Sequence, residues 1–210
     1  MSADKVAVWS FCEEFPTEAP QAAWARQVAL ELGAGSVSVA TGGLLRAVAA
    51  LRQAHAAVEI GGGTGVSGLW ILAGMAPGGV LTTIDPETTY QKVAAEAFRE
   101  AGIPSSRTRF INGRPRDVLP RLAANSYDMM TMGAHPEETP LYVEHAPRIL
   151  RPGGALVIQN GLWFGNVADP ARRDPQTVSL REVLKALADS EEFDVVVLPV
   201  GDGVVLATRR

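Results

Sequence analysis

From Ala56 onward, short apolar runs alternate with segments of helical periodicity, and this alternation limits the fold more than any other feature. The runs are AAVEI, GVLTTI, TRFIN, YDMMTM and GALVIQN. Strands joined by helical crossovers are parallel, and right-handed crossovers place helices on both faces of the sheet. The last two runs, FDVVVLPV and VVLATRR, flank the tight turn Gly201-Asp202-Gly203, which permits only antiparallel neighbours. The pattern predicts an α/β fold with a mostly parallel seven-stranded sheet and an antiparallel C-terminal hairpin strand.

The first 53 residues carry helical patterns and no strand-like run. Apolar residues recur at helical spacing in PQAAWARQVALELG and ATGGLLRAVAALRQA. A chain of 210 residues ordinarily forms one domain. We therefore expect a single domain made of an N-terminal helical segment, 1–53, and an α/β core, 54–210. The aromatic residues of the first segment are expected to be buried, and they are Trp9, Phe11, Phe15 and Trp24.

Charge and cysteine content narrow the choice of partners. A net charge of -4 gives no long-range attraction to nucleic acid or to anionic lipid, so we expect neither partner. The chain has one cysteine, Cys12, and begins without the basic and apolar regions of a secretion signal, so we expect a cytoplasmic protein. No run approaches the roughly 18 apolar residues of a membrane-spanning helix. A small-molecule substrate is the expected partner.

The stretch VEIGGGTGVSG, residues 58–68, joins the first strand to the next helix and carries the strongest chemical signal. Glycines allow a sharp turn and close approach of a ligand, and the helix start offers free amides to an anion. Both a dinucleotide and S-adenosylmethionine use such a loop. Asp85, at the end of the second predicted strand, can accept both hydroxyls of a ribose. Because both cofactors contain ribose, Asp85 does not discriminate between them.

Two residues of this stretch favour the adenosyl cofactor. A dinucleotide loop that follows the strand directly would need glycine where Val66 stands. Glu59 lies inside an otherwise apolar strand, where a buried carboxylate requires a donor or a cation. The ammonium group of S-adenosylmethionine would be such a partner. A nicotinamide-dependent oxidoreductase remains the alternative.

The motifs together resemble a known family. VEIGGGTGVSGLW, TTIDPE, INGRPRDVLPRL, YDMMTM, LRPGGALVIQNGLW and LPVGDGVVLATR are similar, in order and spacing, to the class I S-adenosylmethionine-dependent O-methyltransferases of the catechol O-methyltransferase type, most of all their small bacterial branch. The resemblance implies a Rossmann-like methyltransferase fold, a homodimer formed through the N-terminal region, and a set of cofactor-binding residues. That set is Val37, Glu59, Gly61, Gly62, Gly63, Ser67, Asp85, Pro86, Gly113, Arg114, Gly133 and Ala134.

The acceptor half departs from the family pattern. Metal-dependent members typically end the fourth strand in Asp-Ala-Asp and the fifth in Asp-Asn, whereas this chain has Gly133-Ala134-His135 and Gln159-Asn160. Magnesium prefers carboxylate oxygens, so we expect no divalent metal. Many relatives also carry a lysine suited to proton removal, and Pro136 stands at that position.

Without a metal, the acceptor oxygen needs another route to lose its proton. His135 is the one imidazole at a predicted strand end and is our candidate catalytic residue, with a solvent-facing loop residue as the alternative. An acidic acceptor such as a carboxylate would need no base. Trp163 is a candidate wall of an aromatic acceptor pocket. The predicted function is O-methylation of a small hydroxylated or carboxylated acceptor, and the alternative is a cofactor-binding protein that has lost catalysis.

Overall fold

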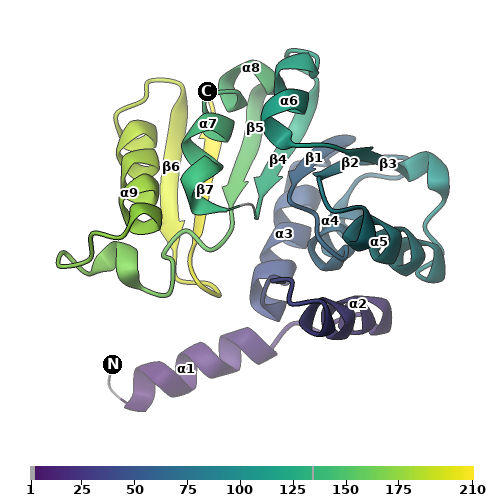
Figure 1. Cartoon of the computed structure of the whole chain (residues 1–210), viewed down its shortest axis with the longest axis horizontal. Helices are drawn as coiled ribbons and strands as arrows, with labels where there is room; N and C mark the ends of the chain where they lie inside the picture. The colour runs from purple at the N-terminus through teal and green to yellow at the C-terminus, as the bar shows by residue number, and fades with distance from the viewer. Residues whose placement is uncertain (1–2, 134) are drawn as a thin grey trace.

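The computed structural model describes residues 3–133 and 135–210, and a seven-stranded sheet forms its centre (Figure 1). The strand order is β3-β2-β1-β4-β5-β7-β6, in which β7 is antiparallel to both neighbours and the other pairs are parallel. This topology confirms the predicted fold. The strands are β1 (Ala56–Ile60), β2 (Val80–Asp85), β3 (Thr108–Asn112), β4 (Tyr127–Met132), β5 (Leu150–Ile158), β6 (Phe193–Leu198) and β7 (Val204–Arg209).

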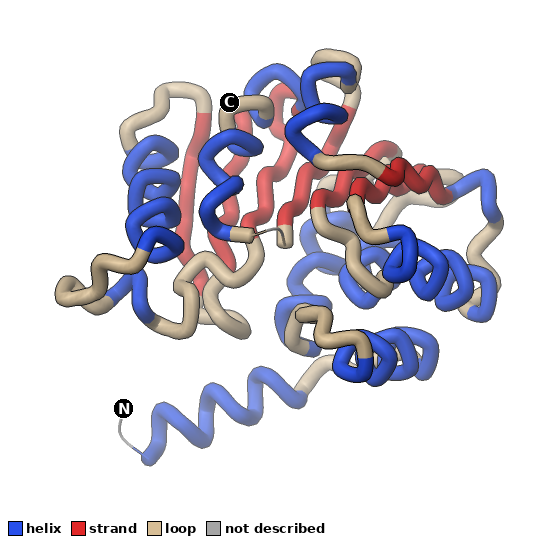
Figure 2. Tube along the Cα trace, in the orientation of Figure 1, coloured by secondary structure: helices blue, strands red, loops and turns tan. Residues whose placement is uncertain are grey.

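The chain reverses direction across the sheet between β1 and β4. From β1 it moves outward through β2 to β3, and then returns to place β4 on the other side of β1. Ligands of open α/β sheets bind beyond the carboxyl ends of the strands at such a switch point. The loops that follow β4 and β5 lie at the sheet edge that faces the N-terminal helices (Figure 2).

Helices cover both faces of the sheet, and each face has its own core. One core joins α2, α3, α4 and α5 to side chains such as Ala57, and the other joins α7, α8 and α9 to Val58 and Ile60. Alternate residues of β1 thus face opposite cores, as the strand period of two requires. The longer helices are α1 (Ala3–Glu14), α2 (Pro20–Glu31), α3 (Val39–Leu51), α4 (Val66–Gly74), α5 (Thr88–Glu100) and α9 (Pro175–Ala188).

Short helices and caps follow from local sequence. The stretch TPLYVEHAPRILRPGG forms α7 (Thr139–Val143), α8 (Ala146–Ile149) and the start of β5. Pro147 explains the break, because proline lacks an amide hydrogen and favours the first turn of a new helix. A further short helix, α6, spans Pro115–Val118. Asp174 caps the N-terminus of helix α9 (Pro175–Ala188) and accepts a hydrogen bond from the Thr177 amide at 3.0 Å.

The N-terminal aromatic residues are not buried within this chain, so the prediction for them was wrong at the level of one subunit. Helix α1 lies apart from the sheet (Figure 1), and it leaves Phe11 66% and Phe15 73% exposed. Trp9 and Trp24 are also exposed. Among residues 3–133 and 135–210, no helix combines the length and apolar composition needed to cross a membrane.

Candidate functional site

A cavity of about 420 Å³ lies at the carboxyl ends of β1, β2, β4 and β5, where the switch point predicts a ligand. The glycine loop after β1 forms one wall, the segment before α3 forms another, and the ends of β4 and β5 complete it. We call it the strand-end cavity. Its lining brings together these predicted residues: Val37, Gly61, Gly62, Gly63, Ser67, Asp85, Gly133 and His135.

The glycines of the loop have separate structural reasons. Gly63 and Gly65 have φ values of +52° and +92°, a region that residues with a side chain rarely adopt. Gly62 needs no such conformation, but a Cβ at this position would lie 2.0 Å from Thr83 Oγ1 and 2.8 Å from Glu59 Oε2. The loop therefore lies directly on buried polar side chains of β1 and β2. Its backbone is left open to the cavity.

Asp85 is fixed in place by main-chain donors on both of its oxygens. The Gly63 amide donates to Oδ2 at 2.9 Å, and the Glu87 amide donates to Oδ1 at 2.8 Å. The side chain is 5% exposed and reaches the strand-end cavity. A carboxylate oxygen has two acceptor sites. Each oxygen of Asp85 therefore keeps capacity for one ligand hydroxyl.

Glu59 lies beneath the glycine loop and not on the cavity wall. It is 1% exposed, and its Oε1 accepts a hydrogen bond of 2.5 Å from the Ser67 hydroxyl, while no residue in the described part of the chain donates a hydrogen bond to its Oε2. Burial raises the pKa of Glu59 to about 7, although the neighbouring hydroxyls of Ser67 and Thr83 lower it and the charge of Asp85 raises it further. Of the two residues predicted to surround the methionine end of the cofactor, Ser67 lines the cavity and Glu59 does not.

The loop after β5 is held in an unusual conformation. Asn160, Trp163 and Phe164 have φ values of +54°, +46° and +55°, which store strain in non-glycine residues. The turn between β6 and β7 holds this loop, because the Phe164 amide donates to both carboxylate oxygens of Asp202 at 2.7 and 2.8 Å. The loop is thus rigidly placed beside the strand-end cavity.

Two further cavities adjoin the strand-end cavity, and all three share Asn160. One, of about 230 Å³, also shares His135 and extends along Trp163 toward α9. The other, of about 550 Å³, runs between Trp163 and Trp9 of α1. The rings of His135 and Trp163 meet edge to face with centroids 6.3 Å apart. Together these cavities provide a partly aromatic space next to the strand-end cavity.

Metal-dependent members of the resembled family carry carboxylates after the fourth and fifth strands, whereas here Gly133 follows β4 and the amides Gln159 and Asn160 follow β5. Gln159 is 7% exposed, and its Nε2 donates to Thr131 Oγ1 at 2.9 Å. A Cβ added to Gly133 would lie 2.7 Å from Gln159 Oε1, so this side chain fills the space above the glycine. Within the described residues, no three His, Cys, Asp or Glu side chains group as a metal site.

Comparison with known proteins assigns the family. The model of the O-methyltransferase family matches residues 24–210, which include the glycine loop, Asp85 and the loop after β5. The chain belongs to this family. A relative from Mycobacteroides abscessus, named as an O-methyltransferase, is 49% identical over 185 residues, which are 88% of this chain and 86% of the relative. Family membership decides against the nicotinamide-dependent alternative.

Solved structures agree with this assignment. A protein from Corynebacterium glutamicum matches the O-methyltransferase chain with a TM-score of 0.89 and 34% identity, over 98% of this chain and 97% of its own. The O-methyltransferase TomG from Streptomyces achromogenes, determined in complex with S-adenosylmethionine, matches with a TM-score of 0.86 and 28% identity, over 100% and 99% of the two chains. The match to TomG confirms the methyltransferase fold.

Other predicted site residues of the O-methyltransferase lie off the cavity wall. Pro86 is exposed and Arg114 is exposed and bonded to Asp117 at 3.1 Å, and neither they nor Gly113 line the strand-end cavity. Ala134 lies outside the described residues. The wall also contains residues that the sequence reasoning missed, chiefly Tyr90 on α5 and the segment 33–36. The segment 33–36 adjoins the predicted residue Val37 in sequence, which was a usable signal, whereas Tyr90 reaches the wall only through the packing of α5.

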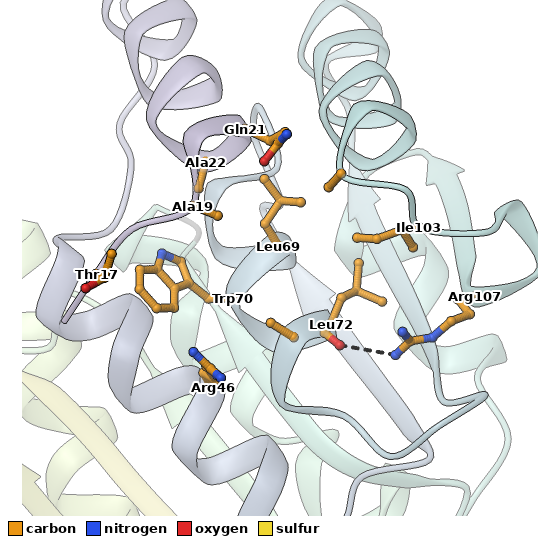
Figure 3. Close-up of a pocket in the computed structure, with 12 residues that line it drawn as sticks. Thr17, Ala19, Gln21, Ala22, Arg46, Leu69, Trp70, Leu72, Ile103 and Arg107 are labelled. Atoms are coloured by element: carbon orange, nitrogen blue, oxygen red, sulfur yellow. Dashed lines mark hydrogen bonds between the residues drawn. The ribbon is translucent and has the colours of Figure 1, made fainter.

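A separate cavity of about 290 Å³ lies between α2, α3 and α4 of the O-methyltransferase (Figure 3). Leu69 and Trp70 of α4 form its floor, and Arg107 closes one side while it donates to the Leu72 carbonyl at 3.1 Å. Its lining has no residue in common with the strand-end cavity.

Proposed function

We propose that this O-methyltransferase transfers a methyl group from S-adenosylmethionine to an oxygen of a small hydroxylated or carboxylated acceptor, and that it needs no divalent metal. The strand-end cavity of about 420 Å³ carries the proposal, because it joins the glycine loop to Asp85. Its volume is typical of small-molecule sites, roughly 300–1,000 Å³. The S-adenosylmethionine complex of TomG, at 28% identity, supports the choice of cofactor.

The cavity wall offers complementary groups to both polar ends of this cofactor. The remaining acceptor sites of Asp85 suit the two ribose hydroxyls. Ser67 and the free amides at the start of α4 suit the amino-acid end, and the backbone of Gly61 and Gly62 allows close approach. When bound, S-adenosylmethionine supplies a methyl carbon that the acceptor oxygen attacks while the bond from that carbon to sulfur breaks.

The two adjoining cavities are the proposed acceptor site. Trp163 lines both of them, and Asn160 stands where they open into the strand-end cavity. Aromatic side chains favour a flat, partly apolar acceptor. Because Asp202 holds the loop that carries Trp163, this wall is preorganised and does not depend on closure by the acceptor.

The residues at the strand ends do not fit magnesium. Gly133 has no side-chain ligand atom, and Gln159 and Asn160 offer neutral amide oxygens, whereas magnesium is usually bound by one or two carboxylates. The Gln159 amide is also committed to Thr131, and it occupies the space that an acidic side chain at position 133 would need. We therefore propose a reaction that proceeds without metal activation of the acceptor.

The acceptor proton then has to leave by another path. For a phenol with a pKa near 10, ionisation at pH 7 requires roughly 4 kcal/mol. His135 lies on the wall shared by the strand-end cavity and the 230 Å³ acceptor cavity. We propose that its imidazole accepts the proton as the new carbon–oxygen bond forms. An acceptor with a carboxylic acid arrives ionised and needs no base.

Radiolabelled S-adenosylmethionine tests this function with a panel of phenols, catechols and carboxylic acids, each with and without chelator. We expect the same amount of labelled product with and without chelator. His135→Gln should lower turnover of phenols by about 100-fold or more, the range of general base catalysis, and should leave carboxylic acids unaffected. His145→Gln is the matched control, because His145 lines none of the three cavities.

Two outcomes would change the proposal in different ways. Loss of activity with chelator would contradict the metal-free part. Tight binding of S-adenosylhomocysteine with no product from any acceptor would favour the second candidate, a cofactor-binding protein without catalysis. The second candidate is supported by the altered strand ends, Gly133 and Gln159.

We further propose that the protein forms a homodimer through its N-terminal helices. Trp9 and Phe11 expose apolar rings on α1, Phe15 does so directly after α1, and Trp24 does so on α2. Phe11 and Phe15 contact each other with centroids 5.5 Å apart, which makes a continuous patch. Light scattering should give twice the subunit mass at micromolar concentration. Phe11→Ser together with Phe15→Ser should shift the mass toward the monomer, and a monomeric parent protein would refute the proposal.

A further inference from the structure

A buried polar layer lies under the glycine loop. In the register of the parallel strands, Glu59 of β1 is paired with Thr83 of β2 and with Thr131 of β4, and all three side chains are at most 2% exposed. Residues paired in this way project from the same face of the sheet. Glu59 is thus a carboxyl group with neutral hydroxyl neighbours, and the residues that the structure describes place no buried cation beside it.

This carboxyl group has one connection to the strand-end cavity. Gly62 covers Glu59, since a Cβ on Gly62 would lie only 2.8 Å from Oε2, and Glu59 itself does not line the cavity. Ser67 is bonded to Glu59 Oε1 at 2.5 Å and does line the cavity. Any ligand in the cavity therefore meets Glu59 through the Ser67 hydroxyl.

The hydroxyl of Ser67 reports the protonation state of Glu59 to the cavity. A serine hydroxyl has one hydrogen to donate and two acceptor sites. When Glu59 is ionised, Ser67 donates to it and turns only acceptor sites toward the cavity, which suits an ammonium group. When Glu59 is protonated, it can donate to Ser67 and free the hydroxyl hydrogen, which suits an ammonium poorly.

We propose that Glu59 is a positioning residue that recognises the ammonium group of the cofactor through Ser67, and that ammonium binding expels a proton from Glu59. The inference rests on the proposed cofactor. A cation one hydrogen bond beyond Ser67 stabilises the carboxylate, and the carboxylate in turn stabilises the cation. Binding and proton loss are therefore linked.

The surroundings of Glu59 place this exchange near neutral pH. Burial raises its pKa to about 7. The groups that face it are Thr83 from β2, Thr131 from β4 and Ser67 from α4, which are neutral, and Asp85 at the end of β2, whose negative charge raises the pKa further. The free protein thus holds the proton at mildly acidic pH, where the ammonium must displace it.

Calorimetric titration with S-adenosylhomocysteine, in buffers of different ionisation enthalpy, measures the protons exchanged on binding. At pH 6.5 a group with a pKa of about 7 is about three-quarters protonated, so we expect release approaching that fraction of a proton per site. Affinity should rise about tenfold from pH 6 to pH 8. Glu59→Gln should abolish both effects and bind more weakly than the parent at pH 8.

Two further variants separate the relay from a structural role. Ser67→Ala keeps the carboxyl group but cuts its connection to the cavity, and should lose the proton release. Thr83→Val is the matched control, because Thr83 also neighbours Glu59 but does not line the cavity. This variant should keep the proton release. Circular dichroism checks that each variant is folded. If Glu59→Gln does not fold, the comparison of Ser67→Ala with Thr83→Val decides.

The possible failures are distinguishable. A parent protein that binds no S-adenosylhomocysteine contradicts the proposed function and this inference with it. Binding without proton release in the parent, or with equal release in Glu59→Gln, overturns the role of Glu59 and leaves the proposed function intact. Release that persists in Ser67→Ala shows direct contact between Glu59 and the ligand and overturns the relay.

Discussion

Raising the pH from 5 to 8 should destabilise the cofactor-free protein through Glu59. The folded protein holds the proton of this group with a pKa of about 7, whereas the ordinary glutamate value, expected in the unfolded chain, is 4.5. Because the folded state binds this proton more tightly, Glu59 stabilises the folded protein, and the stabilisation is complete below pH 4.5. That stabilisation is lost as the pH rises through about 7.

The two pKa values set the size of the effect. Their difference, at about 1.36 kcal/mol per pH unit, gives an upper limit of about 3 kcal/mol. Between pH 5 and pH 8 the contribution to the free energy of unfolding should fall by about 2.5 kcal/mol. Glu59 is 1% exposed, so solvent screens little of this effect.

Urea unfolding at the two pH values measures this contribution. The protein should be dilute, because pH 5 is near the isoelectric point of about 5.4. Other groups also titrate, so the relevant quantity is the pH dependence of the parent minus that of Glu59→Gln. Glu192→Gln makes the same chemical change at an exposed position and should behave as the parent. Equal pH dependence in the parent and in Glu59→Gln would refute the reasoning.

Three further substitutions test a helix contact, the glycine loop and a helix cap. Gly42→Ala places a Cβ 2.3 Å from the indole nitrogen of Trp70 and should lower the free energy of unfolding by about 1–3 kcal/mol, whereas Gly43→Ala, in the same helix, should lower it less. Gly62→Ala places a Cβ 2.0 Å from a buried hydroxyl, and calorimetry should show at least a roughly tenfold loss of S-adenosylhomocysteine affinity. Asp174→Ala removes a helix cap and should lower stability by about 1 kcal/mol in urea unfolding. An unchanged free energy of unfolding, or for Gly62→Ala an unchanged affinity, would refute the corresponding prediction.

Much of the fold could be predicted because its signals are local. The apolar runs correspond to the seven strands, and the Gly201-Asp202-Gly203 turn correctly indicated the antiparallel pair. Pro147, in the first turn of α8, is a local signal of the same kind. The burial expected for the N-terminal aromatic residues is not seen within one subunit. Their burial depends on what α1 packs against, and a helical pattern contains no such information.

The site divides in the same way. The sequence by itself determined which residues follow each strand, and strand ends of a parallel sheet gather at one edge, so the glycine loop and Asp85 were predictable. Only the tertiary structure decided that Gly62 separates Glu59 from the cavity, that Gln159 fills the space above Gly133, and that Tyr90 joins the wall. Periodicity, turns and caps act over a few residues, whereas these contacts join side chains from separate strands and helices and depend on how closely those elements pack.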